Sequence, residues 1–127
     1  YMPSFRVHLP DNKAIHKWHY DSDPDHLHPE WEINFQVALT DMYDTQATWI
    51  ETVPGLKSYL PMEMEYGEFY IFNGNKCTHG NKENTSGKTR VSFDFRVLPK
   101  SRYNPNFKES VTAKKKFLLG DYYKEIK

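Results

Sequence analysis

The chain of 127 residues lacks three features that would each have indicated a class of protein. It has a single cysteine, Cys77, which excludes an internal disulfide framework and is typical of a reducing compartment. Its 17 Lys and Arg residues balance 17 Asp and Glu residues, so there is no basic field to attract nucleic acid or an anionic membrane. It has no apolar run of membrane-spanning length, and Tyr1-Met2-Pro3 is not the start of a signal peptide. We therefore expect a cytoplasmic protein that binds neither nucleic acid nor a membrane.

Aromatic residues, in contrast, are abundant at 16% of the chain, and they favour the half-buried surfaces of β-sheets. Apolar and polar residues alternate clearly over 31–39 and 89–97, and 68–72 is a shorter strand candidate. Weaker strand patterns cover 5–8, 14–20 and 46–53, a further short segment lies near 57–60, and only 109–119 could form a short helix. Many short strands with little helix indicate a barrel or a sandwich.

The length suits one domain with one core. We expect a single domain over 1–127, with its core at about 14–99 and a C-terminal extension at 100–127.

The strand predicted at 89–97 has one apolar and one polar face. Arg90, Ser92 and Arg96 share the polar face. Arg90 and Ser92 could bind a carboxylate together, the arginine through its planar fork and the serine through its hydroxyl. Asn34 and Gln36 occupy the polar face of the strand at 31–39 and could do the same. Small barrels line ligand cavities with such inward polar positions, whereas an ordinary amphipathic strand would turn them to water.

Two histidines and one aspartate are the best candidates for a metal site. In His19-Tyr20-Asp21 the first and third side chains project from the same face of an extended backbone, as a chelating pair requires. His79 follows the turn at 73–75 and adjoins Gly80, which leaves room for a close approach. Two imidazoles and one carboxylate are the ligands of the facial triad that holds non-haem Fe(II). Taken singly, these residues also fit an edge strand and a surface loop.

In this order, His19-Tyr20-Asp21, His79 and Arg90-Val91-Ser92 resemble the HxD…H…RxS motif of the Fe(II)/2-oxoglutarate-dependent dioxygenases. Residues 14–99 look like the core of that family. The stretches 67–74 and 89–96 are similar to its phytanoyl-CoA-hydroxylase-like and streptomycin-biosynthesis-hydroxylase-like branches.

The resemblance implies an all-β double-stranded β-helix, or jelly roll, with few helices. It implies that His19, Asp21 and His79 hold Fe(II) and that 2-oxoglutarate is the cosubstrate, with its far carboxylate on Arg90, assisted by Ser92. From their strand face we also assign Asn34 and Gln36 to the cosubstrate pocket, although polar cross-strand pairing explains them equally well. We expect no catalytic residues beyond the metal ligands. The expected reaction is hydroxylation of a small-molecule or sugar-like substrate.

Trp49 and Glu51 share a face before the turn at Pro54-Gly55 and could border the substrate pocket, although core packing and a surface acid explain them as well. Two other functions remain open. His26, His28 and Glu32 match the first motif of the cupins, HxHxxxE, which would make the protein a metal-dependent isomerase or epimerase on the same barrel. Because two prolines enclose these histidines, we prefer a solvated polar loop there. The other alternative is a metal-free jelly-roll module that binds its ligand through aromatic residues.

Overall fold

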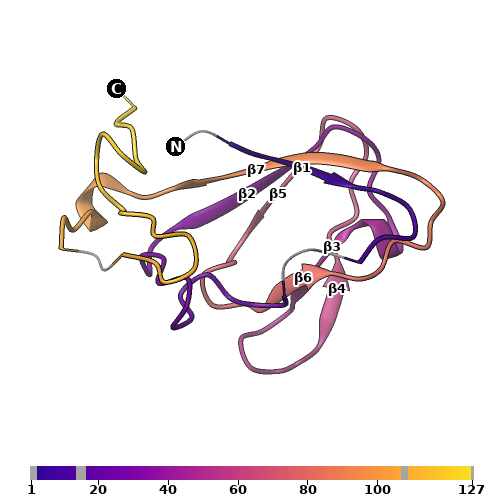
Figure 1. The fold of residues 1–127 in the computed structure, drawn as a ribbon, viewed down its shortest axis with the longest axis horizontal. Coiled ribbons are helices and arrows are strands. Elements are labelled where there is room, and N and C mark those ends of the chain that lie inside the picture. The colour runs from indigo at the N-terminus through magenta and orange to yellow at the C-terminus, as the bar shows by residue number, and fades with distance from the viewer. Residues whose placement is uncertain (1–2, 14–16, 107–108, 127) are drawn as a thin grey trace.

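The computed structural model describes residues 3–13, 17–106 and 109–126. They are built almost entirely of strands in two antiparallel sheets (Figure 1). Within these ranges there is no α-helix, only two short 3-10 turns at Asp44–Gln46 and Lys100–Arg102. Accordingly, no described segment forms a helix that is long and apolar enough to cross a membrane. The expectation of a nearly all-β protein is confirmed.

The larger sheet has four strands in the order β1-β7-β2-β5, and the smaller has three in the order β4-β3-β6. In chain order the strands are β1 (Ser4–His8), β2 (Ile33–Ala38), β3 (Thr48–Glu51), β4 (Tyr59–Pro61), β5 (Phe69–Phe72), β6 (His79–Asn81) and β7 (Arg90–Val97). Every pairing between them is antiparallel. Both sheets are open, and no strand pairing among the described residues joins them into a closed barrel.

The strands predicted at 31–39, 68–72 and 89–97 are confirmed as β2, β5 and β7, each shortened by a residue or more. The weaker strand pattern over 14–20 does not form a strand in its described part, residues 17–20. Residues 14–16 lie outside the described part of the chain, and His19 forms only an isolated bridge with His79.

The short helix predicted over 109–119 is wrong. The backbone N–H groups of Val111 and Thr112 donate to the carbonyl of Asp25, far away in the sequence, and that of Lys115 donates to the side chain of Ser110. Lys114 has a φ of 48°, in the left-handed region that ends a helix. Tertiary hydrogen bonds have replaced the local ones on which a helix depends.

The polar faces of β2 and β7 point into the molecule. Asn34, Gln36, Arg90 and Ser92 are all at most 5% exposed, whereas Phe69 on β5 is 59% exposed on the opposite face. The larger sheet therefore presents polar side chains to the interior and aromatic ones outward, the reverse of an ordinary amphipathic sheet.

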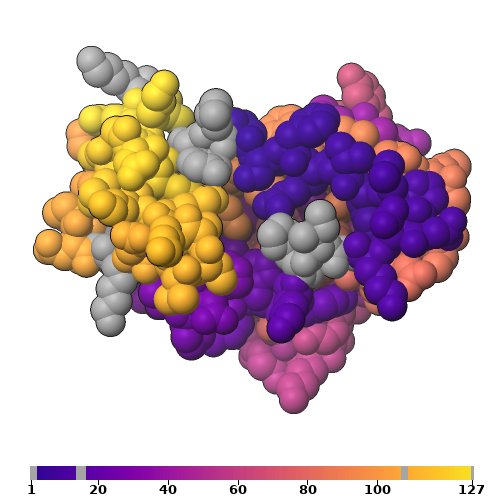
Figure 2. Space-filling view, viewed as in Figure 1, coloured from indigo at the N-terminus to yellow at the C-terminus, as the bar shows by residue number. Residues whose placement is uncertain are grey.

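Apolar packing is divided between two small clusters. One joins Ala38, Met42, Ala47 and Met64 at one end of the sheets. The other is formed by the C-terminal segment, in which Phe117, Tyr122 and Tyr123 pack with Leu98 and Tyr103. In the space-filling view this segment covers one end of the molecule (Figure 2).

Candidate metal centre and ligand cavity

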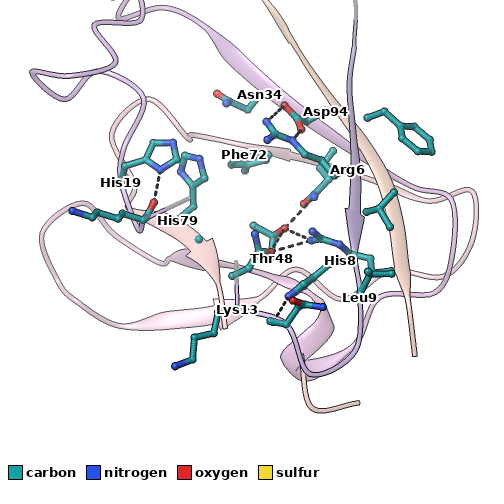
Figure 3. A pocket seen from close by; sticks show the side chains of 18 of the residues that line it. Arg6, His8, Leu9, Lys13, His19, Asn34, Thr48, Phe72, His79 and Asp94 are labelled. Carbon is teal, nitrogen blue, oxygen red and sulfur yellow. Dashed lines mark hydrogen bonds and ion pairs between the residues drawn. The ribbon is translucent and has the colours of Figure 1, made fainter. Parts of the chain in front are cut away.

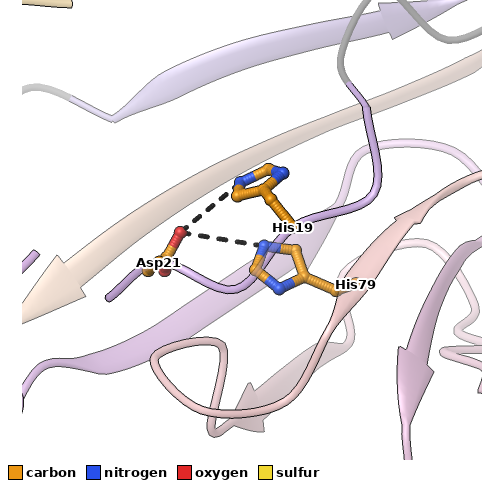
Figure 4. Close-up of side chains that lie close together, drawn as sticks. All are labelled: His19, Asp21 and His79. Atoms are coloured by element: carbon orange, nitrogen blue, oxygen red, sulfur yellow. Dashed lines mark ion pairs between the residues drawn. The ribbon is translucent and has the colours of Figure 1, made fainter. Parts of the chain in front are cut away.

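The backbone brings His19, Asp21 and His79 to one place. His19 and His79 exchange backbone N–H···O=C bonds of 3.1 and 2.8 Å, and the N–H of Asp21 donates to the carbonyl of Gly74 at 2.8 Å. Because His19 and Asp21 are two residues apart on this extended segment, both side chains turn toward His79 (Figure 4). The sequence spacing and the pairing with β6 together create the cluster.

The three side chains converge on a common point. Asp21 Oδ1 lies 3.7 Å from His19 Nε2 and 3.8 Å from His79 Nε2, and one ligand atom from each residue lies within 4.8 Å of the other two. Ligands at right angles and about 2.1 Å from an ion lie about 3.0 Å apart. The three ligand atoms therefore lie somewhat farther apart than they would around a bound ion.

Hydrogen bonds fix which nitrogen of each imidazole is available. His19 Nδ1 lies 2.8 Å from the carbonyl of Lys17, and His79 Nδ1 lies 3.1 Å from that of Cys77. A carbonyl only accepts, so in both rings Nδ1 carries the proton and donates it. Neutral rings of this tautomer turn the Nε2 lone pair toward Asp21, which is the arrangement that metal-binding histidines adopt.

The charges around the cluster keep the carboxylate ionised. Burial favours the neutral form of Asp21, but Arg96 and the nearby histidines outweigh it and hold the pKa of Asp21 well below its usual range. Burial lowers the pKa of His79 and keeps that ring neutral. Burial also favours the neutral form of His19, but the hydrogen bond and charge of Asp21 are among the effects that outweigh it and raise the pKa of His19. The site thus offers one anion and two imidazoles.

Asp21 is held by two neighbours. Asn34 Nδ2 donates to Oδ2 at 2.6 Å, and Arg96 donates to both carboxylate oxygens at 3.0 Å. A side chain at Gly74 would collide with Asn34, because a Cβ there would lie 2.7 Å from its Nδ2. The glycine therefore keeps Asn34 in contact with Asp21.

A cavity of about 400 Å³ opens beside the histidines, between the two sheets. His19 and His79 lie together on one side of it, and Arg6 pairs with Asp94 on another (Figure 3). Among the described residues its wall carries five cationic side chains and a single carboxylate: Arg6, Lys13, Lys17, Arg90, Arg96 and Asp94. Such a lining favours an anionic ligand.

Arg90 is buried in the cavity wall without a carboxylate partner among the described residues. Its Nη1 donates to Thr48 Oγ1 at 2.8 Å and to Asn81 Oδ1 at 3.0 Å. Its Nε is buried and has no hydrogen-bond acceptor in the described part of the chain. Burial lowers the pKa of Arg90 to about 10, helped by Arg6 and opposed by Asp94. An anion entering the cavity would relieve this uncompensated charge.

The other predicted cosubstrate residues divide into two groups. Asn34 and Gln36 line the cavity, and the carbonyl oxygens of both side chains are buried without a donor among the described residues. Ser92 is not part of the cavity wall; its hydroxyl accepts from Gln36 Nε2 at 3.4 Å. Ser92 therefore supports Gln36 and does not itself reach the cavity.

The structure does not bring Trp49 or Glu51 to the cavity wall. The indole N–H of Trp49 donates to the carbonyl of Asp44, and Lys82 lies over its ring. Glu51 is buried and accepts backbone N–H bonds from Lys57 and Thr78 at 2.6 and 3.1 Å. Both side chains organise loops around β3, so their predicted place beside the substrate has no support in this geometry.

The cupin-like set His26, His28 and Glu32 does not converge among the described residues. His26 stacks on His19 with ring centres 4.2 Å apart, whereas His28 Nδ1 lies 2.6 Å from Glu32 Oε2. The expectation of a solvated loop is also wrong for His28, which is buried with Glu32. The C-terminal segment covers this pair, and nothing in the local sequence signals it.

Sequence reasoning missed several residues that organise the site. Thr48 and Asn81 accept hydrogen bonds from Arg90 and position it. Arg96 donates two hydrogen bonds to Asp21. Alternation placed Arg96 on the same face of β7 as Arg90 but did not reveal its contact with Asp21. No motif could have indicated that a carboxylate 75 residues away would be its partner.

The chain is similar to known proteins in sequence and in fold. The chain is similar to the streptomycin biosynthesis protein StrG of Streptomyces griseus, with 39% identity over 125 residues, or 98% of this chain. It spans 58% of the length of that curated relative. Among solved structures it resembles EvdMO1, with a TM-score of 0.58 and 17% identity over 78% of this chain and 27% of the other. The latter similarity concerns the fold alone. No protein-family model matches the chain.

Proposed function

We propose that the chain forms the catalytic core of an Fe(II)/2-oxoglutarate-dependent oxygenase that hydroxylates a small-molecule or sugar-like substrate in a biosynthetic pathway. One observation carries the proposal: two imidazoles and a carboxylate converge at one side of a cavity that also contains the buried Arg90. The printed function of the StrG relative, streptomycin biosynthesis, supports a small-molecule substrate.

The strand order supports a jelly roll as the finer description of the fold. The His19–His79 bridge lies beside β6, in the place of an edge strand of the smaller sheet. With that bridge as an eighth strand position, the two sheets have four members each, as in a double-sheet jelly roll. The packing of the C-terminal segment onto residues near His28 supports a single domain over 1–127 with an extension at 100–127.

The residues of the site fit the two groups that the proposal requires. His19, Asp21 and His79 are the ligand types of a 2-His-1-carboxylate triad, and both Nε2 atoms face Oδ1 of Asp21. The buried Arg90, whose Nε lacks a partner among the described residues, fits the far carboxylate of 2-oxoglutarate through a bidentate contact. Fe(II) with 2-oxoglutarate would supply the oxidising chemistry, and the protein supplies binding, orientation and exclusion of water.

The test is an anaerobic titration of Fe(II) followed by 2-oxoglutarate, monitored by absorption and by metal content. Wild-type protein should bind one equivalent of iron and develop a visible absorption band only when 2-oxoglutarate is added. Asp21→Ala should lose both, whereas Asp23→Ala, which removes a carboxylate from the adjacent turn, should retain both.

Other outcomes would overturn the proposal. Iron bound equally well by Asp21→Ala would remove the assigned ligand. Metal binding with no response to 2-oxoglutarate would favour a cupin-type enzyme, and no metal binding at all would favour a metal-free binding module.

A further inference from the structure

Behind the candidate metal ligands lies a chain of buried charged and polar groups. Arg96 lies between two carboxylates, those of Asp21 and Glu32, which are 1% and 4% exposed. It donates to Asp21 Oδ2 through Nε and to Oδ1 through Nη2, both at 3.0 Å, and its Nε lies 3.8 Å from Glu32 Oε2. One arginine therefore connects the candidate metal site to a second carboxylate, which is not part of the cavity wall.

The contacts of Asp21 make its two oxygens unequal. Oδ2 accepts from both Arg96 Nε and Asn34 Nδ2, which occupies both of its in-plane lone pairs. Among the described residues Oδ1 accepts a hydrogen bond from Arg96 Nη2 alone, which leaves one lone pair on the oxygen that lies near the histidine nitrogens. The carboxylate is thus oriented to give a metal ion one oxygen.

Glu32 is held in turn by residues of the loop and of the C-terminal segment. His28 Nδ1 lies 2.6 Å from Oε2, and the hydroxyl of Tyr123 donates a short hydrogen bond to Oε1. Burial, with the charge of Glu32, raises the pKa of Tyr123, so its hydroxyl remains a donor. Phe117 packs against the His28 ring with ring centres 4.6 Å apart.

A second carboxylate is needed because Arg96 and a bound divalent cation would share Asp21. Charges of the same sign repel strongly where water is excluded, and a metal ion at Oδ1 would push Arg96 away from Asp21. Glu32 attracts Arg96 from the opposite side and compensates its charge. Without Glu32, the guanidinium would be buried beside the ion with a single anion for both.

We propose that Arg96 and Glu32 are positioning residues, with Tyr123 behind them, that hold Asp21 so that only Oδ1 is available to the metal. The inference rests on the proposed metal at His19, Asp21 and His79. It makes the C-terminal segment part of the metal centre, although that segment contributes no ligand.

The test measures Co(II) binding and the visible Co(II) spectrum of the full chain, because both report on ligand geometry without catalysis. Outer-shell partners of metal ligands typically change affinity about 10–100-fold. Glu32→Gln should weaken Co(II) binding by about 10-fold and alter the spectrum, and Arg96→Lys should retain more affinity than Arg96→Met. Tyr123→Phe, which removes one oxygen and keeps the ring, should act in the same direction by roughly threefold.

Tyr103→Phe is the matched control. Tyr103 packs against Tyr123 with ring centres 6.3 Å apart, and its hydroxyl accepts from the N–H of Leu119. This variant also loses one hydroxyl from the C-terminal cluster, so it should bind Co(II) with wild-type affinity and spectrum.

If Glu32→Gln does not fold, Tyr123→Phe compared with Tyr103→Phe decides the question. Wild-type affinity and spectrum in the folded Glu32 and Tyr123 variants would overturn the positioning role and leave the metal site intact. Failure of the wild-type protein to bind Co(II) would overturn both.

Discussion

Two arginines on the same face of β7 lie in opposite environments. Arg90 is bound by neutral oxygens, those of Thr48 and Asn81, and burial lowers its pKa to about 10. Arg96 is also largely enclosed, with its side chain 10% exposed, but Asp21 and the more distant Glu32 outweigh the effect of burial and raise its pKa. Both side chains line the same cavity.

The difference separates an internal cation from one that is available to a ligand. The charge of Arg96 is already satisfied by the protein, so a ligand gains little by approaching it. Arg90 has been desolvated without a compensating anion, so an incoming carboxylate regains an interaction that folding has removed. On this ground we propose Arg90, and not Arg96, as the anchor for 2-oxoglutarate.

The largest expected effect is on stability. Arg96→Met leaves Asp21 and Glu32 buried without their cation and should lower the free energy of unfolding by about 3–5 kcal/mol. Arg90→Met removes a cation that has no carboxylate partner and should lower the free energy by less than about 1 kcal/mol, or raise it. Urea denaturation of the two metal-free variants beside the wild type gives the comparison.

A variant that removes the whole network serves as the control for Arg96→Met. With Asp21→Asn and Glu32→Gln added, no uncompensated charge remains, and much of the lost stability should return. Equal losses for Arg90→Met and Arg96→Met would break the distinction between the two residues.

A smaller effect is expected on cosubstrate binding. A lysine is a point charge and cannot form the bidentate contact of a guanidinium, so Arg90→Lys should weaken 2-oxoglutarate binding by roughly 10-fold without releasing the metal. Titration of 2-oxoglutarate into Fe(II)-loaded wild type and variant, without oxygen, measures both properties. Identical affinities would remove Arg90 from the cosubstrate site.

The smallest effect is a dependence of stability on pH. The pKa of Arg90 is about 10 in the folded protein, below its ordinary 12.5, so its charge destabilises the fold fully below pH 10 and progressively less above it. Relative to Arg90→Met, the wild type should gain about 1 kcal/mol in free energy of unfolding as the pH rises from about 10 to about 11. Paired denaturation curves at each pH cancel the titration of other groups, and a constant difference would contradict the lowered pKa.

The sequence predicted those features that depend on local spacing. Alternation gave the strands and placed Arg90, Ser92 and Arg96 on one face, and the HxD spacing placed His19 and Asp21 on the same side of the chain. The assembly of Asp21 with His79 required a resemblance to a known motif, because nothing local connects the two.

The parts that sequence reasoning missed depend on distant partners. His28 is enclosed by prolines in a polar stretch, yet Phe117 and Tyr122 cover it from about 90 residues further along the chain. Residues 109–119 could form a helix by composition, but the carbonyl of Asp25 takes the backbone donors of Val111 and Thr112. In both cases long-range contacts overrode the local pattern.

The most direct test of the account removes the contact between Arg90 and the far carboxylate of 2-oxoglutarate, first by changing the ligand and then by changing the protein. 2-Oxopentanoate keeps the keto-acid end of 2-oxoglutarate but lacks the far carboxylate. Fe(II)-loaded wild type should bind 2-oxoglutarate more tightly than 2-oxopentanoate by about 1.5–3 kcal/mol, the value of a hydrogen bond to a charged group. Arg90→Met should bind the two alike and keep its metal. A preference for 2-oxoglutarate that survives in Arg90→Met, or no preference in the wild type, would contradict the account.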